Sequence, residues 1–329
     1  MSDLTPTGRA TRAPHNVEDT APGSESIEAE AATATPPPSG TPTPGRDQAR
    51  SQLQIALGDL IRSPLFLVSL VCMAFLAVVA VFPGLFTNAN PAACDLGNSM
   101  AGPSDGHPFG YDFQGCDLYA RTVYGARNSI AVGLLATLLS AIVGGLLGIL
   151  GGYFGGWLDT LLSWVTNIFF GLPLLLGAIV ILNSLGRPEG VWGVTLALGA
   201  FGWMAVARMM RASVMVVKNQ DYVVAAKSLG AGTGRMMLRH VLPNSLTSLI
   251  VYSTILLGVT IAAEATLSFL GAGIQPPAIS WGVMISEAQA RISTDARPLL
   301  IPAAALSFTV LTFIMLGEAV RDALDPKLR

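Results

Sequence analysis

Long stretches with few or no charged residues constrain this chain more than any other feature. A helix needs about 20 mostly apolar residues to cross roughly 30 Å of hydrocarbon. Six stretches of the sequence meet that length, at about 64–86, 128–152, 160–184, 191–216, 245–271 and 298–319. The sequence therefore predicts an all-α integral membrane protein, a bundle of six transmembrane helices.

The composition supports a bilayer as the solvent. Charged residues make up 12% of the 329 residues and hydrophobic residues 51%, whereas a soluble domain carries about 25% charged residues. So few charges cannot cover a water-facing surface of this size. The second stretch also carries glycines at helix-packing spacing, which let neighbouring helices approach closely. These glycines are Gly144, Gly145, Gly148, Gly151 and Gly152.

The residue types of catalytic and metal sites are scattered along the chain. The three cysteines form no CxxC pair, the three histidines lie far apart, and no Cys/His cluster indicates a metal site. The sequence has no GxxxxGK(S/T) loop that would cradle phosphates. We therefore expect no metal, no cofactor and no catalytic residue on this chain.

Three regions follow one another along the sequence. Residues 1–50 are rich in Ala, Thr, Pro, Ser and Glu and carry too little apolar surface to fold, which predicts a disordered tail. They lack the basic start and apolar stretch of a secretory signal. Residues 57–127 hold the first transmembrane helix and a long loop. Residues 128–329 form the core transmembrane domain.

The distribution of Lys and Arg predicts the orientation in the membrane. Six spans place both termini on one side. That side carries twelve Lys and Arg residues from Arg46 onward, and the other side carries five. Since loops rich in Lys and Arg stay in the cytoplasm, we expect a cytoplasmic location for both termini, for the tail 1–50 and for the loop 218–244. The loops 87–127 and 272–297 are then outside.

The loop 218–244 carries the signals of a short helix that lies outside the hydrocarbon. Asp221 is a good N-cap, and Gly230 suits a left-handed stop two helical turns later. Pro243 sits where the next membrane helix begins, a position at which proline is tolerated. We therefore expect a short cytoplasmic helix between two spans.

This short helix has the composition of a docking surface. Ala225 and Ala226 are small enough for another protein to approach closely, and Tyr222 and Leu229 are candidate apolar anchors. From the helix signals alone, a plain loop whose arginines face anionic lipid headgroups is an alternative.

The residue pattern of the loop adds a family resemblance. DYVVAAKSLGAG at 221–232, followed by RHVLPN at 239–244, resembles the EAA loop of bacterial ATP-binding-cassette (ABC) importer permeases. The alanine pair, the following glycine and the later Leu-Pro are the diagnostic positions of that motif. Val224 departs from the pattern, because many members carry glutamate there.

Three further segments resemble one branch of that family, the C-type permeases of dipeptide and oligopeptide importers. They are HPFGYDFQGCDLYARTVYGARNS at 107–129, EATLSFLGAGIQPPAISWG at 264–282 and LGEAVRDALDPKLR at the C-terminus. The resemblance runs from about residue 57 to residue 329. Nickel importers share these segments.

The resemblance implies a type I ABC importer permease fold with a cytoplasmic coupling helix, in a bacterial plasma (inner) membrane. The chain would form half of a pore for di- and oligopeptides and work by alternating access. Implied partners are a homologous second permease, one or two ABC ATPase subunits that carry ATP and Mg, an extracytoplasmic solute-binding protein and the lipid bilayer, with no nucleic acid. The implied ATPase-coupling residues are Asp221, Tyr222, Ala225, Ala226, Lys227, Leu229, Gly230, Ala231, Arg235, Arg239, Leu242 and Pro243.

Other functions remain as alternatives. Within the family, nickel or haem are alternative cargos. An ion-coupled secondary transporter would need paired ionisable residues at mid-membrane and broken helices around a central site, and the spans carry no charge near their middles. A membrane anchor or assembly factor would not need the Ala-Ala…Gly loop.

Several single residues carry separate expectations. Glu264 lies about twenty residues past Asn244, so we favour a position near the outer boundary, paired or hydrated there, over a pore-facing group. Cys94 and Cys116 both fall in the external loop, where oxidising conditions favour a disulfide, with two independent thiols as the alternative. Asp159 is in a position to balance helix ends.

The external segment 272–297 has two compatible interpretations. Trp281 is either an aromatic anchor at the membrane interface or, with Gln275, Pro276 and Pro277, part of an outer-mouth loop. The family resemblance implies that this loop meets the binding protein.

Overall fold

The computed structural model describes residues 60–186 and 190–324. The chain divides into two units, Met1–Ala49 and Arg50–Arg329, and the predicted tail 1–50 lies outside the described residues. Among the described residues, every regular element longer than an isolated bridge is a helix. These are α2 (Pro64–Val81), α3 (Leu118–Phe154), α4 (Gly156–Phe170), α5 (Leu174–Ser184), α6 (Val191–Val217), α7 (Asp221–Ser228), α8 (Thr233–Met236), α9 (Leu242–Phe269), α10 (Trp281–Ala288) and α11 (Arg297–Leu324).

Five helices of the described residues are long and apolar enough to cross a membrane: α2, α3, α6, α11 and the continuous helix Thr233–Phe269. The remaining predicted span, 160–184, is not a single helix. It consists of α4 and α5, which are bent by 93° at a short break. Gly171 ends α4 and Pro173 precedes α5. Proline lacks an N–H and disfavours helical geometry at the residue before it, so the helix breaks there.

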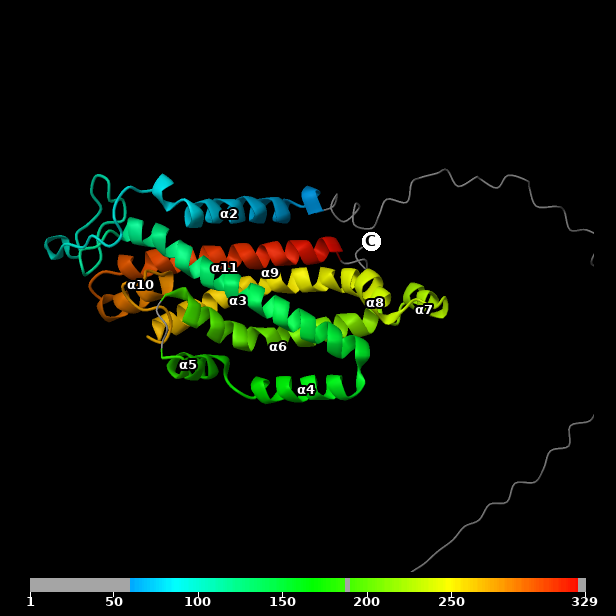
Figure 1. Ribbon diagram of the computed structural model, residues 1–329. Coiled ribbons are helices and arrows are strands. Elements are labelled where there is room, and N and C mark those ends of the chain that lie inside the picture. The colour runs from blue at the N-terminus through cyan, green and yellow to red at the C-terminus, as the bar shows by residue number, and fades with distance from the viewer. Residues whose placement is uncertain (1–59, 187–189, 325–329) are drawn as a thin grey trace, which may run out of the picture. The chain divides into compact units, whose positions relative to one another are not determined.

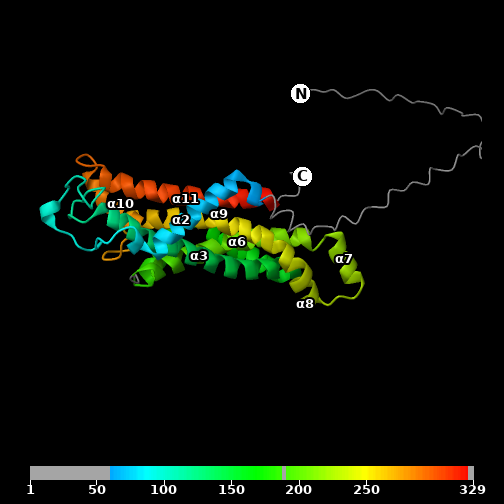
Figure 2. The same ribbon diagram turned by 90° about the horizontal axis from the view of Figure 1, so that it is seen from above.

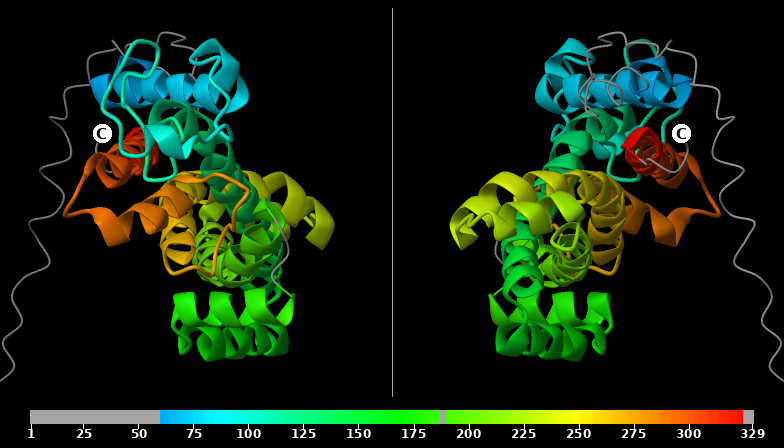
Figure 3. Two further views of the ribbon diagram at one scale, coloured as in Figure 1. Left: turned by 90° about the vertical axis from the view of Figure 1, so that its left-hand side faces the viewer. Right: turned by 90° about the vertical axis from the view of Figure 1, so that its right-hand side faces the viewer.

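The helices run side by side, with different elements at the two ends (Figure 1). The 87–117 loop and α10 lie at one end, called here the α10 end, and α7 and α8 lie at the other, the α7 end; Figure 2 agrees. The last turn of α11 is also at the α7 end. The helix α2 lies on one side of the bundle, and α4 and α5 lie on the opposite side (Figure 3).

The glycines of α3 form its seam with α6. A Cβ on Gly144 would come within 2.4 Å of the Trp203 carbonyl oxygen, and one on Gly148 within 2.6 Å of the Ala207 carbonyl oxygen. Both glycines are fully or nearly fully buried. The small-residue spacing thus brings the two backbones into direct contact, as the sequence predicts.

The helix α3 begins ten residues before the predicted span, inside the stretch expected to be loop. Asp117 is its N-cap, and the Asp117 carboxylate accepts a hydrogen bond from the Ala120 N–H at 2.9 Å. A capping aspartate satisfies one of the unpaired N–H groups of the first turn. The extra turns carry Arg121 and Gly125 toward α10.

Candidate functional site

The candidate site is α7 with the segment that follows it, residues 218–244. Gln220 is the N-cap of α7 and makes no side-chain capping bond. The expected N-cap, Asp221, is instead the first helical residue. There its negative charge faces the unpaired N–H groups of the first turn, which also stabilises the helix end.

The C-terminus of α7 closes at Gly230. This glycine has φ +83°, the left-handed conformation that the sequence predicts. The Gly230 N–H donates to the Lys227 carbonyl at 3.0 Å, and the Ala231 N–H donates to the Ala226 carbonyl at 3.1 Å. These two bonds are those of a Schellman motif, so the chain leaves α7 in a fixed direction.

The following helix starts earlier than Pro243. Residues Thr233–Phe269 form one continuous helix that contains a widened turn at Met237–Val241. Pro243 has no N–H to offer the carbonyl four residues earlier, and such a gap is accommodated by a wider turn. The Asn244 side-chain amide donates to the His240 carbonyl at 2.6 Å. The proline therefore lies inside a continuous helix rather than at its first residue.

A few contacts hold α7 to the bundle. Val223 is 3% exposed and packs in a cluster with Met210 and Val214 of α6 and with Met236 and Val241. Just before α7, the Lys218 ammonium donates to the Gly152 carbonyl at 2.6 Å in the last turn of α3, where a cation interacts well with the helix end. One side of α7 is thus anchored to α3 and α6.

The other side of α7 is open. Tyr222, Ala225 and Leu229 recur at helical spacing and are all exposed; we call these three the α7 surface. Leu229 is 89% exposed and Tyr222 47%. The helix projects beyond the ends of the long helices (Figure 1). An apolar surface that projects in this way fits a protein partner.

Most of the other predicted coupling residues share this exposure. Exposed ones are Asp221, Lys227, Gly230, Arg235, Arg239 and Pro243, and half-buried ones are Ala226, Ala231 and Leu242. Within residues 218–244, all of which are described, no ion pair occurs. The positive side chains here are therefore not neutralised by any carboxylate of the described residues.

The α10 end separates the predicted outer-mouth residues. Gln275, Pro276 and Pro277 are exposed, whereas Trp281 is 2% exposed. The Trp281 indole N–H donates to the Thr122 carbonyl at 2.9 Å. Burial against α3 differs from both expectations for Trp281, because each needs an exposed ring.

A disulfide and several hydrogen bonds hold the loop before α3 in place at the α10 end. Cys94 and Cys116 are joined in a disulfide. Asp112 accepts hydrogen bonds from the Cys116 N–H at 2.9 Å and from the Arg121 guanidinium at 2.5 Å. Arg121 also donates to Glu287 of α10 at 2.8 Å. This ion-pair network connects the loop, α3 and α10.

Glu264 lies in α9 near this end, and it is fully buried. The Ser268 hydroxyl donates to its carboxyl at 2.8 Å, and the hydroxyls of Ser129 and Ser280 face the same group. Of the two environments expected for Glu264 at the outer boundary, paired or hydrated, burial contradicts hydration, and the Ser268 hydroxyl is a direct partner. Ser268 is bonded to one carboxyl oxygen, Oε1, and the other, Oε2, is buried without a hydrogen-bond partner among the described residues.

Two features of the structure were not predicted from the sequence. Val223 is the buried anchor of α7, and its only signal is its offset from the exposed Tyr222 on a short helix. The pair of Arg121 and Glu287 joins residues 166 positions apart, which no local pattern indicates. Across the described residues, no group of three or more His, Cys, Asp or Glu side chains is placed to hold a metal ion.

Known proteins resemble this chain in sequence and in fold. The model of the binding-protein-dependent transport system inner membrane component family matches residues 144–329. The glutathione transport system permease protein GsiD of Escherichia coli O6:K15:H31 is 40% identical over 235 residues, 71% of this chain and 77% of that protein. GsiD of Shigella flexneri serotype 5b is 42% identical with the same coverage.

One solved structure shares the helical arrangement. A chain of the MetNI methionine ABC transporter, in an inward-facing conformation, aligns with a TM-score of 0.53 and 20% identity. The alignment covers 61% of this chain and 95% of that chain. At this identity the likeness concerns the fold.

Proposed function

This chain belongs to the family of binding-protein-dependent transport system inner membrane components, and from that premise we propose that it imports small peptides. It is a membrane-embedded permease subunit of an ABC importer with the type I permease fold. Its relatives include permeases named for glutathione, which is itself a small peptide. A di- or oligopeptide cargo fits that relationship.

The α7 surface is the docking site for a cytoplasmic ATPase in this proposal. One observation carries it: α7 projects from the bundle with Val223 buried beneath it and with Tyr222 and Leu229 exposed. Apolar anchors of this kind provide most of the binding energy at protein interfaces. The uncompensated Lys227, Arg235 and Arg239 around them add electrostatic selectivity for an acidic partner surface.

The rest of the importer follows from the same assignment. ATP and Mg bind to the partner ATPases, and this chain provides a path and catalyses nothing. A second, homologous permease forms the other half of the pore. The α7 end and both termini face the cytoplasm. The α10 end, with the exposed Gln275, Pro276 and Pro277, faces the solute-binding protein outside.

Movement reaches the membrane helices through two connections. Val223 ties α7 to α6, and the Schellman motif at Gly230 fixes the path into the continuous helix Thr233–Phe269. A displacement of α7 by the ATPase is therefore passed to α6 and α9 together. This motion opens the pore to one side at a time.

A purification from mild detergent tests the assembly. Tagged wild-type chain is expected to bring down an ATPase and a second permease, identified by mass spectrometry. The Leu229→Arg variant is expected to lose the ATPase and keep the permease, because a charge replaces the exposed apolar anchor. Val224→Arg, at an exposed position of α7 outside the α7 surface, is the control and is expected to retain both.

Two outcomes of this purification would contradict the proposal. Recovery of the wild-type chain alone, under conditions that keep other importers intact, would contradict the assembly. Equal ATPase recovery with Leu229→Arg would move the docking site away from the α7 surface.

Cargo is tested with the reconstituted importer and its binding protein, by comparing ATP hydrolysis with dipeptides, glutathione, Ni²⁺ and haem. Stimulation by Ni²⁺ or haem alone would overturn the peptide assignment.

A further inference from the structure

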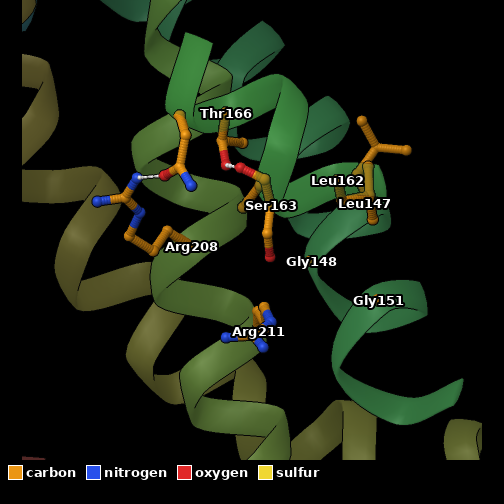
Figure 4. Close-up of a pocket in the computed structure, with 10 residues that line it drawn as sticks. Leu147, Gly148, Gly151, Leu162, Ser163, Thr166, Arg208 and Arg211 are labelled. Carbon is orange, nitrogen blue, oxygen red and sulfur yellow. Dashed lines mark hydrogen bonds between the residues drawn. The ribbon is translucent and has the colours of Figure 1, made fainter. Parts of the chain in front are cut away.

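A cavity of about 210 Å³ lies between α3, α4 and α6 (Figure 4), and no residue of α7 or α10 lines it. Its apolar wall is formed by Leu147 and Leu162, with Gly148 and Gly151 alongside. Its polar wall is formed by residues of α4 and α6. These are Ser163, Thr166, Asn167, Arg208 and Arg211.

The two arginines of the cavity differ in their charge balance. Arg211 forms an ion pair with Asp159 at the start of α4, with the Arg211 Nη2 and the Asp159 Oδ2 at 2.6 Å. Arg208 donates to the Asn167 side-chain oxygen at 3.1 Å and stacks over the Phe170 ring at 4.1 Å. Among residues 60–186 and 190–324, no carboxylate pairs with Arg208. The cavity thus carries one uncompensated positive charge.

The position of Arg208 along α6 places that charge at a membrane boundary. Helix α6 begins at Val191 and runs toward the α7 end. At 1.5 Å per residue, about 20 residues cross roughly 30 Å of hydrocarbon. Residues 208–211 therefore lie where the hydrocarbon gives way to headgroups on the α7 side.

The neighbouring surface of α4 is apolar and aromatic. Trp157, Leu161, Trp164 and Ile168 recur at helical spacing and are all exposed. They lie on the face of α4 opposite its cavity-lining residues. Tryptophan is enriched at the boundary between hydrocarbon and headgroups, so α4 combines a lipid-compatible outer face with a polar inner face.

We propose that this cavity binds the phosphate of an anionic phospholipid headgroup from the leaflet on the α7 side. The planar guanidinium of Arg208 matches phosphate oxygens, and the hydroxyl of Ser163 and the amide of Asn167 supply further donors. Asn167 and Phe170 hold the guanidinium in place before the lipid binds. Basic pockets between membrane helices on the cytoplasmic side select such headgroups. This inference rests on the proposed function only for the identification of this leaflet as the cytoplasmic one.

The charge balance predicts selectivity for anionic over zwitterionic lipid. A phosphatidylcholine headgroup carries its own ammonium, which compensates its phosphate. Phosphatidylglycerol lacks that cation and gains more from Arg208. One cation at a membrane surface contributes about a fivefold preference.

Native mass spectrometry of the purified importer complex tests the site. The complex is incubated with equal amounts of phosphatidylglycerol and phosphatidylcholine, and the retained lipids are counted. Wild type is expected to retain phosphatidylglycerol about five times more often, and Arg208→Gln is expected to remove that preference. Arg321→Gln is the control for a surface arginine, because Arg321 is exposed in the last turn of α11 at the α7 end, where it pairs with Glu318. It is expected to behave as wild type.

Three outcomes would overturn the proposal. One is an equal preference in wild type and Arg208→Gln. Another is an equal loss in Arg321→Gln, which would indicate a diffuse surface charge. The third is displacement of the lipid by excess inorganic phosphate, which would indicate a site for free phosphate.

Two further variants keep the test independent of folding and of the transport mechanism. If Arg208→Gln elutes as aggregate, Arg208→Lys keeps the charge, and Asn167→Ala removes the group that positions the guanidinium. A partial loss of preference is expected in both, and full retention in both would overturn the proposal. Lipid retention is measured without cargo or ATP, so a failure of the importer assignment leaves this result interpretable.

Discussion

The two ends of this molecule are built in opposite ways. At the α10 end, the loop before α3 is fastened by a disulfide and by the buried network of Asp112, Arg121 and Glu287. At the α7 end, the stretch from Lys218 to Asn244 is held to the bundle mainly through Val223 and Lys218, and its cations form no ion pair with any described residue. Charged groups at the α10 end are paired with one another, whereas Lys227, Arg235 and Arg239 at the α7 end are exposed and form no ion pair among the described residues.

This contrast predicts which substitutions lower stability and which weaken association with a partner. Groups that are paired inside the chain determine stability, because removing one leaves its partner buried and unpaired. Groups that are exposed contribute little to stability and much to association. Variants at the α10 end are thus expected to unfold the protein, and variants at the α7 end to uncouple it.

The largest loss of stability is expected from Arg121→Ala. It leaves the buried Asp112 and the half-buried Glu287 without their cation, and breaking a buried pair in this way costs about 3–5 kcal/mol of unfolding free energy. Denaturant unfolding in detergent measures the loss. Arg127→Ala, six residues further along α3 and exposed, is the control and is expected to change stability by less than about 0.5 kcal/mol. Similar losses in both variants would contradict the comparison.

Reduction of the disulfide is expected to have the next largest effect. A bond between Cys94 and Cys116 closes a loop of 22 residues, and a loop of that size stabilises the native state by about 3 kcal/mol. Non-reducing mass mapping should recover the two cysteines in one linked peptide. The melting temperature should fall with reductant while Cys72, free in the structure, is unaffected. Free thiols at both positions would show this prediction to be wrong.

A smaller loss of stability but a complete functional loss is expected from Gly230→Asp. The Cβ finds open space, so the cost comes from the φ of +83° and amounts to about 1 kcal/mol. The new charge stands beside the α7 surface, and we expect solute-stimulated ATP hydrolysis to be lost in a folded importer. Gly232→Asp, where φ is −67° and space is also open, is the matched control. Normal stimulation in Gly230→Asp would contradict the coupling role of this turn.

The smallest effect concerns acid stability at the α10 end. The hydrogen-bonded guanidinium of Arg297 lowers the pKa of the Asp295 carboxyl below its ordinary value of 3.8. A lowered pKa stabilises the folded state above that value, and the contribution is lost as the pH falls below it. Asp295→Asn should therefore cost less than about 1 kcal/mol at neutral pH and nothing at the acid limit.

The same contrast explains what the sequence could predict. Features fixed by neighbours along the chain were predictable: Gly230 stops a short helix, and Gly144 and Gly148 mark a close helix contact. The break between α4 and α5 also had a local signal in Gly171-Leu172-Pro173, but the apolar run around it favoured an uninterrupted span.

Features fixed by distant residues were not predictable. Trp281 is buried because α3 presents Gly125 and the Thr122 carbonyl to it, and neither is near it in sequence. Glu264 is surrounded by hydroxyls from three different segments. The side chains alone resemble those of an interface, and only the tertiary fold shows that they lie inside the protein.

The glycine seam between α3 and α6 has a mechanical consequence. Backbone meets backbone along it, so no side-chain torsion is available there to absorb a load, and close-packed interiors compress little. A push at the end of α6 is shared by α3 along its length, and the two helices act as a single strut. Compliance is left to the joints between other elements, above all the break between α4 and α5.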